Sequence, residues 1–90
     1  MIICAAIKFT FIDIEDKEQS IMICGYRHSD CFSIWYKFII KQNCKKLIQN
    51  VQGFMDDKGN FLNRIDARNH FIECNQGTPK WNQLYSEDLY

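Results

Sequence analysis

The chain has 90 residues, of which 47% are apolar and 14% aromatic, and its 11 basic side chains are balanced by 11 acidic ones. This length fits one domain over residues 1–90 with a limited core, so oligomerisation would add stability. The zero net charge argues against a binder of long nucleic acids, and the longest apolar run is too short to span a bilayer. The aromatic side chains fit a core, a ligand pocket or an interface, and composition leaves these uses open.

The cysteines indicate a reducing environment. The chain holds five of them and no Cys-x-x-Cys pair: Cys4, Cys24, Cys31, Cys44 and Cys74. The N-terminal residues lack the basic segment and the cleavage site of a signal peptide. We therefore expect reduced, mostly buried thiols in a cytosolic protein without a membrane partner.

The first third of the chain predicts a β-hairpin. Apolar and polar residues alternate over 2–14, with many β-branched and aromatic side chains, which is typical of a strand. Residues 15–19 form a polar break of hairpin-loop length, and residues 20–24 return as a second strand. An antiparallel hairpin is the most economical interpretation.

An amphipathic helix is predicted next. Ser29 is a good N-cap, Asp30 suits the positive first turn, and apolar residues follow at a spacing of three to four as far as about Ile40. The segment 42–49 is ambiguous. It fits a polar turn leading into a short strand over 46–51, or a further helical turn.

The second half predicts another hairpin followed by a helix. Residues 52–55 and 60–62 flank a turn in which Gly59 supplies the positive φ. Asn63 is the expected N-cap of a helix over 64–76.

The end of the chain is too apolar for a free tail. Gly77 is the expected stop of the second helix, with Pro79 just beyond it. Residues 80–90 have no clear period, and we expect them to dock on the sheet or on a partner chain. The predicted fold is therefore α+β: a small antiparallel sheet with two helices packed on it, in one oligomeric domain.

The cysteines and histidines do not favour a zinc site. Cys24, His28 and Cys31 are close in sequence, and His70 and Cys74 lie one helical turn apart. Structural zinc usually needs four ligands in a closed tetrahedron, and the alternative is that these thiols belong to the core. We expect no bound metal and no cofactor.

A cysteine nucleophile is the next hypothesis. Cys31 stands near a helix N-terminus and close to a histidine, which is the minimal Cys/His arrangement. It occupies an apolar position of that helix, however, and no phosphate loop or nucleophile elbow is present. We therefore expect no catalytic residue and no enzyme activity.

Two arginines at helix starts favour an anion-binding site. Arg27 and Arg64 each follow a glycine-containing corner, and arginine suits bidentate contact with phosphate. Neighbouring groups could complete a nucleotide site: His28, Asp30 and Asn63 by hydrogen bonds, and Phe9, Phe11, Phe54 or Phe61 by stacking. The alternative is ordinary ion pairs, of Arg27 with Asp30 or of Arg64 with Asp57 or Asp66.

The chain also resembles a known family over nearly its whole length. The resemblance is carried by four segments in order: Ala5-Ala6-Ile7-Lys8-Phe9, Gly25-Tyr26-Arg27-His28-Ser29-Asp30-Cys31, Gln52-Gly53-Phe54-Met55 with Gly59-Asn60-Phe61-Leu62-Asn63-Arg64-Ile65-Asp66-Ala67, and Leu84-Tyr85-Ser86-Glu87-Asp88-Leu89-Tyr90. These look like small phage proteins, most of all the first-described phage anti-Thoeris sponges.

The resemblance implies a non-enzymatic sponge. Members of that family bind cyclic ADP-ribose isomers, and some related sponges take up cyclic oligonucleotides, in dimers or larger assemblies with ligand pockets at subunit interfaces. Applied to this chain, the resemblance implies that Arg27 and Arg64 hold the diphosphate of the ligand. Phe11 or Phe61 would stack a base, and His28 and Asn63 would supply polar contacts.

The expected function is therefore sequestration of a cyclic nucleotide immune signal in the cytoplasm of an infected bacterial cell, by a homodimer or higher homo-oligomer. The alternative is a phage protein that inhibits a host defence protein by direct binding. A third hypothesis is a Cys/His hydrolase acting on the same ligands.

Overall fold

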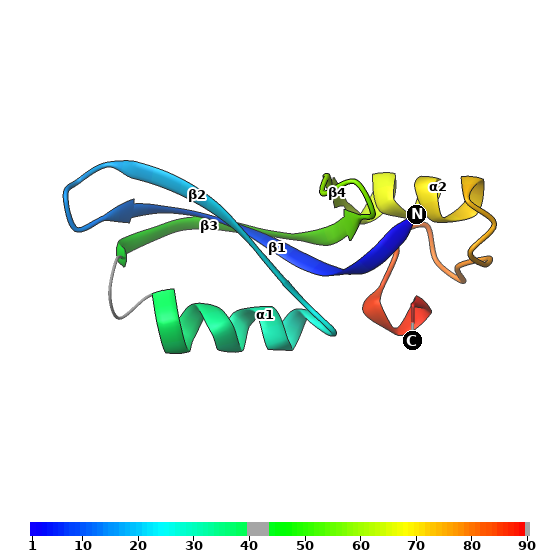
Figure 1. Ribbon diagram of the computed structural model, residues 1–90, viewed down its shortest axis with the longest axis horizontal. Helices are drawn as coiled ribbons and strands as arrows, with labels where there is room; N and C mark the ends of the chain where they lie inside the picture. Colours follow the sequence, from blue (N-terminus) through cyan, green and yellow to red (C-terminus); the bar gives the residue numbers. More distant parts are fainter. Residues whose placement is uncertain (40–43, 90) are drawn as a thin grey trace.

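The computed structural model describes residues 1–39 and 44–89 (Figure 1). Its sheet has four strands: β1 (Ile2–Asp13), β2 (Glu18–Gly25), β3 (Cys44–Asp56) and β4 (Phe61–Asn63). Its helices are α1 (His28–Ile34), which continues as a π-helical turn η1 (Trp35–Ile39), α2 (Arg64–Glu73) and a short 3-10 turn η2 (Ser86–Asp88). The α+β prediction, with one sheet and two helices in one domain, is confirmed.

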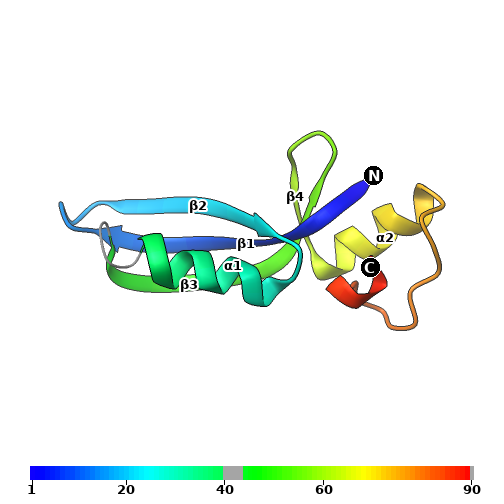
Figure 2. The same cartoon turned by 60° about the horizontal axis from the view of Figure 1, so that its bottom comes forward.

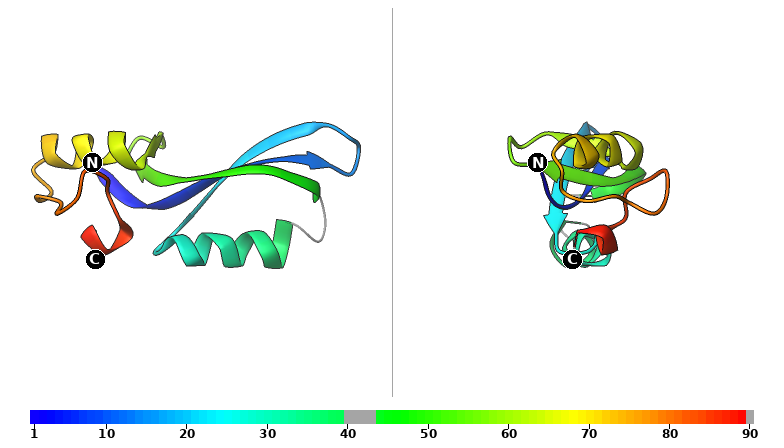
Figure 3. Two further views of the ribbon diagram at one scale, coloured as in Figure 1. Left: turned by 180° about the vertical axis from the view of Figure 1, so that it is seen from behind. Right: turned by 90° about the vertical axis from the view of Figure 1, so that its right-hand side faces the viewer.

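The sheet is antiparallel throughout, with the strand order β2-β1-β3-β4. The three long strands form a curled, twisted ribbon, so the molecule is elongated, with extents of 44 × 22 × 20 Å. Helix α1 runs along this ribbon, whereas α2 lies at its far end beside β4 and the N-terminus (Figure 2). Seen end-on, the two helices lie on opposite sides of the long axis (Figure 3).

The core consists of two small clusters, one under each helix. Under α1, the indole of Trp35 stacks on the ring of Phe9 with centroids 4.4 Å apart. Under α2, Phe54 and Phe71 pack around fully buried Ala5. The two clusters use side chains from one face of β1, which turns from one helix to the other as the sheet twists.

Helix α1 begins earlier than the sequence predicts. Its N-cap is Arg27, not Ser29, and the carboxylate of Asp30 accepts a hydrogen bond from the backbone N–H of Arg27 at 2.9 Å. Because an aspartate three residues after the cap closes the first turn, no hydroxyl cap is needed. The predicted end near Ile40 lies outside the described residues.

Strand β3 is longer than predicted. It runs without a break from Cys44 to Asp56, so the helical alternative for residues 44–49 is wrong, and positions 42 and 43 lie outside the described residues. Pairing with β1 along its length stabilises this polar segment as a strand. The hairpin turn is confirmed, with Gly59 at φ +82°.

Helix α2 starts as predicted and ends early. The side chain of Asn63 accepts a hydrogen bond from the N–H of Asp66 at 2.8 Å, which confirms it as the N-cap. The helix ends at Glu73 because Asn75 takes the left-handed conformation, with φ 55°, two residues before Gly77. The C-terminal segment docks as expected, with Leu84 fully buried in the cluster under α2.

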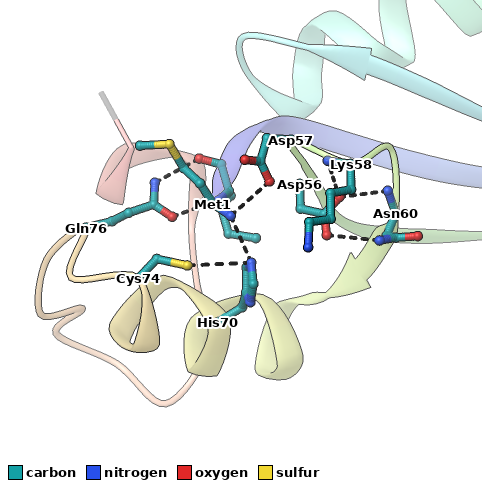
Figure 4. Close-up of polar contacts among 9 residues, drawn as sticks. Met1, Asp56, Asp57, Lys58, Asn60, His70, Cys74 and Gln76 are labelled. Carbon is teal, nitrogen blue, oxygen red and sulfur yellow. Dashed lines mark hydrogen bonds and ion pairs between the residues drawn. The ribbon is translucent and has the colours of Figure 1, made fainter.

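Polar contacts join the start of β1 to α2 (Figure 4). The amino group of Met1 lies 3.1 Å from Asp57 Oδ1 and 2.9 Å from His70 Nε2. The side-chain amide of Gln76 donates to the carbonyl of Ile2 and accepts from its N–H, at 2.8 and 2.7 Å. These contacts fix α2 against the end of the sheet and so position the first residue of that helix, Arg64.

Candidate functional site

A surface cavity of about 460 Å³ lies where three separate segments meet. The segments are the start of α1, the start of α2 and the C-terminal turn η2, which faces the start of α1 in Figure 1. The lining residues are Arg27, His28, Ser29, Arg64, Tyr85, Ser86 and Glu87. Its volume falls in the range typical of small-molecule sites, about 300–1,000 Å³.

Arg64 is the most firmly held of these side chains. Its guanidinium donates to the carbonyl of Leu84 at 2.8 Å and to the side-chain oxygen of Gln52 at 2.7 Å, and it lies 4.9 Å from the ring centroid of Tyr85. None of the ion pairs among the described residues involves Arg64. Its charge is thus oriented by neutral acceptors, and burial lowers its pKa from the ordinary value.

His28 is a neutral hydrogen-bonding group beside Arg64. Its Nε2 lies 2.8 Å from the carbonyl oxygen of Gly53, which can only accept, so the proton is assigned to Nε2. Its Nδ1 is then an acceptor, 3.5 Å from Arg64 Nη2. Burial lowers the pKa of His28 below 6.5, and the charge of Arg64 lowers it further, which keeps the ring neutral at pH 7.

Arg27 approaches the cavity from the other helix start. Its backbone closes the first turn of α1, and its guanidinium lies 5.0 Å from the ring centroid of Tyr26. The carboxylate of Asp30 points to the backbone of this corner rather than into the cavity. The structure thus brings Arg27, His28 and Arg64 of the sequence-predicted site into one cavity.

The other four predicted residues lie elsewhere. Phe11 packs in the cluster under α1 and lines a second cavity of about 280 Å³, near Ile39. Phe61 covers Gly53, where an added Cβ would lie 2.7 Å from the Phe61 ring.

The two polar residues of the predicted site have structural contacts instead. Asn63 is the cap of α2, and Asp30 closes the first turn of α1. The aromatic surface of the arginine-lined cavity is instead Tyr85.

The C-terminal turn supplies three lining residues that sequence reasoning missed: Tyr85, Ser86 and Glu87. Ser29 is a fourth, which the sequence indicated only as a helix cap. Asp88 accepts a hydrogen bond from the N–H of Tyr85 at 2.9 Å, which forms the turn. Arg27 and Asp30 have the same spacing and the same contact at the start of α1. This repeated spacing is the signal that could have marked the tail as a structured corner facing the first one.

The cysteine near this cavity is part of the core. Cys31 is fully buried, and its thiol lies 3.6 Å from the carbonyl oxygen of Arg27 and 3.9 Å from that of Ala5. Burial raises the pKa of this thiol to about 11, whereas a nucleophilic cysteine needs a lowered one. Among residues 1–39 and 44–89, no three or more His, Cys, Asp or Glu side chains are grouped so that they could hold a metal ion.

The fold and the cavity define a small α+β protein with an arginine-lined pocket beside two helix starts. The chain belongs to the Phage T4 y16D protein family, whose model matches residues 1–90. This description names no function, and the resemblance to the anti-Thoeris sponges stays a prediction. No curated protein and no solved structure matches the chain. No helix in the described part of the chain is long and apolar enough to cross a membrane.

Proposed function

We propose that this phage-family protein binds and sequesters a small nucleotide signal, such as a cyclic ADP-ribose isomer of the glycocyclic type, without cleaving it. The observation that carries the proposal is the convergence of Arg27 and Arg64 on one cavity. The two residues are far apart in sequence, and each stands at the start of a different helix. Two guanidinium groups suit a ligand with two linked phosphates.

The remaining lining groups fit the rest of such a ligand. The ring of Tyr85 offers a flat face for a base, and the carboxylate of Glu87 can accept hydrogen bonds from ribose hydroxyls or an exocyclic amine. The Nδ1 of His28 is a further acceptor beside the cationic Arg64. A cavity with both cations and acceptors favours a nucleotide over a simple anion.

Sequestration needs binding and no turnover, so a non-catalytic site suffices. The thiol of Cys31 is buried with a raised pKa, and the neutral His28 is held through Nε2 by a backbone carbonyl. Neither group is set up as a nucleophile or as a free general base. We therefore propose a binding protein rather than a hydrolase, acting in the cytoplasm of an infected bacterial cell.

A homodimer or a higher homo-oligomer is part of the proposal. In the described sheet, β4 pairs only with Gly53–Met55 of β3. Much of the outer edge of β3 can therefore pair with another strand. A second copy joined there would enlarge the small core and could enclose the open cavity, which would strengthen the charged contacts by excluding water.

Direct binding to a host defence protein is the second candidate, and exposed aromatic side chains favour it. Tyr26, Tyr36 and Trp81 are 55%, 57% and 59% exposed. Large exposed aromatics are enriched at protein interfaces.

The test is an uptake-and-release measurement. The protein is incubated with a cyclic ADP-ribose isomer, separated from unbound ligand and heat-denatured, and the released nucleotide is analysed by mass spectrometry. Recovery of intact ligand supports the proposal. Recovery of an altered ligand shows an enzyme, and no uptake of any cyclic nucleotide favours the host-protein candidate.

Arg68 provides a matched control within the same helix. Its Nε donates to the carbonyl of Trp81 at 2.7 Å, so it also ties α2 to the C-terminal segment, but it does not line the cavity. Arg27→Ala and Arg64→Ala should each reduce uptake, whereas Arg68→Ala should leave it unchanged. Equal uptake by all three variants would contradict the site.

A further inference from the structure

Three sulfur atoms gather on the face of the sheet that α1 does not cover. In the register of the sheet, Cys4 of β1 lies opposite Met55 of β3, and Ala6 of β1 lies opposite Cys24 of β2. Cys4 and Ala6 are two residues apart and so share a face, opposite to the face of Ala5 and its core cluster. The register therefore places two thiols and one thioether around a single point of β1.

The side chains from the two outer strands meet across β1. The Cys24 sulfur lies 3.6 Å from the Met55 sulfur, although β1 runs between their strands. On β1, Ala6 lies opposite Cys24 and Cys4 lies opposite Met55, and Ala6 is small and fully buried.

The cluster is partly shielded and can still be reached by a small ion. Cys4 and Cys24 are both half-buried, and neither forms a disulfide. The ring of Phe61 packs over the adjacent Gly53 and covers one side of the cluster.

We propose that Cys4, Cys24 and Met55 form a binding site for a soft monovalent metal ion, Cu(I) or its analogue Ag(I). Thioether and thiolate sulfur prefer soft ions such as Cu(I), and a thioether is a poor ligand for Zn(II). Each thiol that becomes a ligand releases its proton to solvent, and the oxidation state of the metal does not change. The trio differs from the cysteine and histidine set that could suggest zinc, because it includes a methionine and neither histidine.

The site is independent of the arginine-lined cavity. Met55 and Cys4 do not line that cavity, and the sulfur cluster lies on the opposite face of the sheet from α1. Loss of metal binding therefore leaves the proposed nucleotide binding untouched, and the reverse also holds. A negative result for Cu(I) binding would therefore not count against nucleotide binding, and the reverse also holds.

The test is an anaerobic titration of the reduced protein with Cu(I), supplied as its acetonitrile complex, in competition with bicinchoninate. The background is Cys44→Ser combined with Cys74→Ser, which removes two thiols outside the cluster. We expect one Cu(I) per chain, with preference over Zn(II), and an apparent affinity that rises with pH as the thiols lose protons more easily. Met55→Leu keeps the size of the side chain, removes the thioether and should weaken binding by about tenfold.

Cys4→Ser and Cys24→Ser should each lower the affinity more than Met55→Leu does. Circular dichroism of the metal-free variants checks that the sheet is intact, and Arg68→Ala serves as a folded control that keeps full Cu(I) affinity. Unchanged Cu(I) affinity in Met55→Leu and Cys24→Ser would overturn the proposal. Tighter binding of Zn(II) than of Cu(I) would also overturn it.

Discussion

The two helix starts beside the cavity carry an arginine each, but they hold it in different ways. At the start of α2, the cap is a separate residue, Asn63, and Arg64 uses its side chain to bind the C-terminal segment. At the start of α1, Arg27 is itself the cap and contributes its backbone to the corner. Similar sequence signals thus produce one arginine that supports the fold and one whose side chain is not needed to close its turn.

Arg64→Ala should have the largest effect. It leaves the carbonyl of Leu84 and the side chain of Gln52 without their charged donor, at a cost of about 2–3 kcal/mol of unfolding free energy. Urea denaturation followed by circular dichroism measures this loss. A loss no greater than that of Arg68→Ala would contradict the larger contribution of Arg64 to stability.

The pH dependence of stability tests the neutral state of His28. Because burial lowers its pKa in the folded state, the unfolded chain takes up a proton first as the pH falls. The stability from the neutral ring is complete above about pH 6.5 and is lost as the pH falls through the lower folded pKa, by at most about 1.4 kcal/mol at pH 5.5.

Thermal unfolding at pH 7.5 and 5.5 measures this effect against His28→Gln. The variant should be the less stable protein at pH 7.5, and the difference should shrink at pH 5.5. A constant difference would show that folding does not lower the pKa of His28.

Asn63→Ala should cost about 1 kcal/mol, the usual value for loss of an N-cap hydrogen bond. The effect should be confined to α2, because Asn63 bonds only the N–H of Asp66 in that turn. Hydrogen exchange of the first turns of α1 and α2 compares the two corners in one sample. Equal loss of protection at both helix starts would contradict the claim that different residues stabilise the two starts.

Arg27→Ala should have the smallest effect on stability, about 1 kcal/mol at most. Alanine at position 27 keeps the backbone N–H that donates to the carboxylate of Asp30. It also keeps the carbonyl that accepts from the backbone N–H of Asp30. The same variant should lose ligand uptake, so Arg27 should contribute to ligand binding and little to the stability of the fold. A large loss of stability would show that the guanidinium itself supports the corner.

The sequence was sufficient for the parts of the fold that local chemistry determines. Alternation predicted β1 and β2, and Asn63 and Gly59 marked the start of α2 and the second hairpin turn. The length of β3 was not predictable from its polar first half, because its pairing with β1, distant in sequence, makes it a strand.

The candidate site was predictable only in part for the same reason. Arg27, His28 and Arg64 stand at helix starts, where local signals are strong. The resemblance implies Phe11 or Phe61 as the aromatic partner, whereas the ring beside Arg64 is that of Tyr85, in a segment without periodicity. The position of Tyr85 depends on the packing of Leu84 in the core under α2, and no local sequence pattern predicts this tertiary contact.

The central claim is that Arg27 and Arg64 bind one ligand together in the cavity. The most direct measurement is isothermal titration calorimetry of cyclic ADP-ribose isomers with the wild-type protein and with Arg27→Ala, whose fold should be intact. The account predicts binding to the wild-type protein and an affinity at least about tenfold lower for Arg27→Ala. Equal affinity for the two proteins would contradict it.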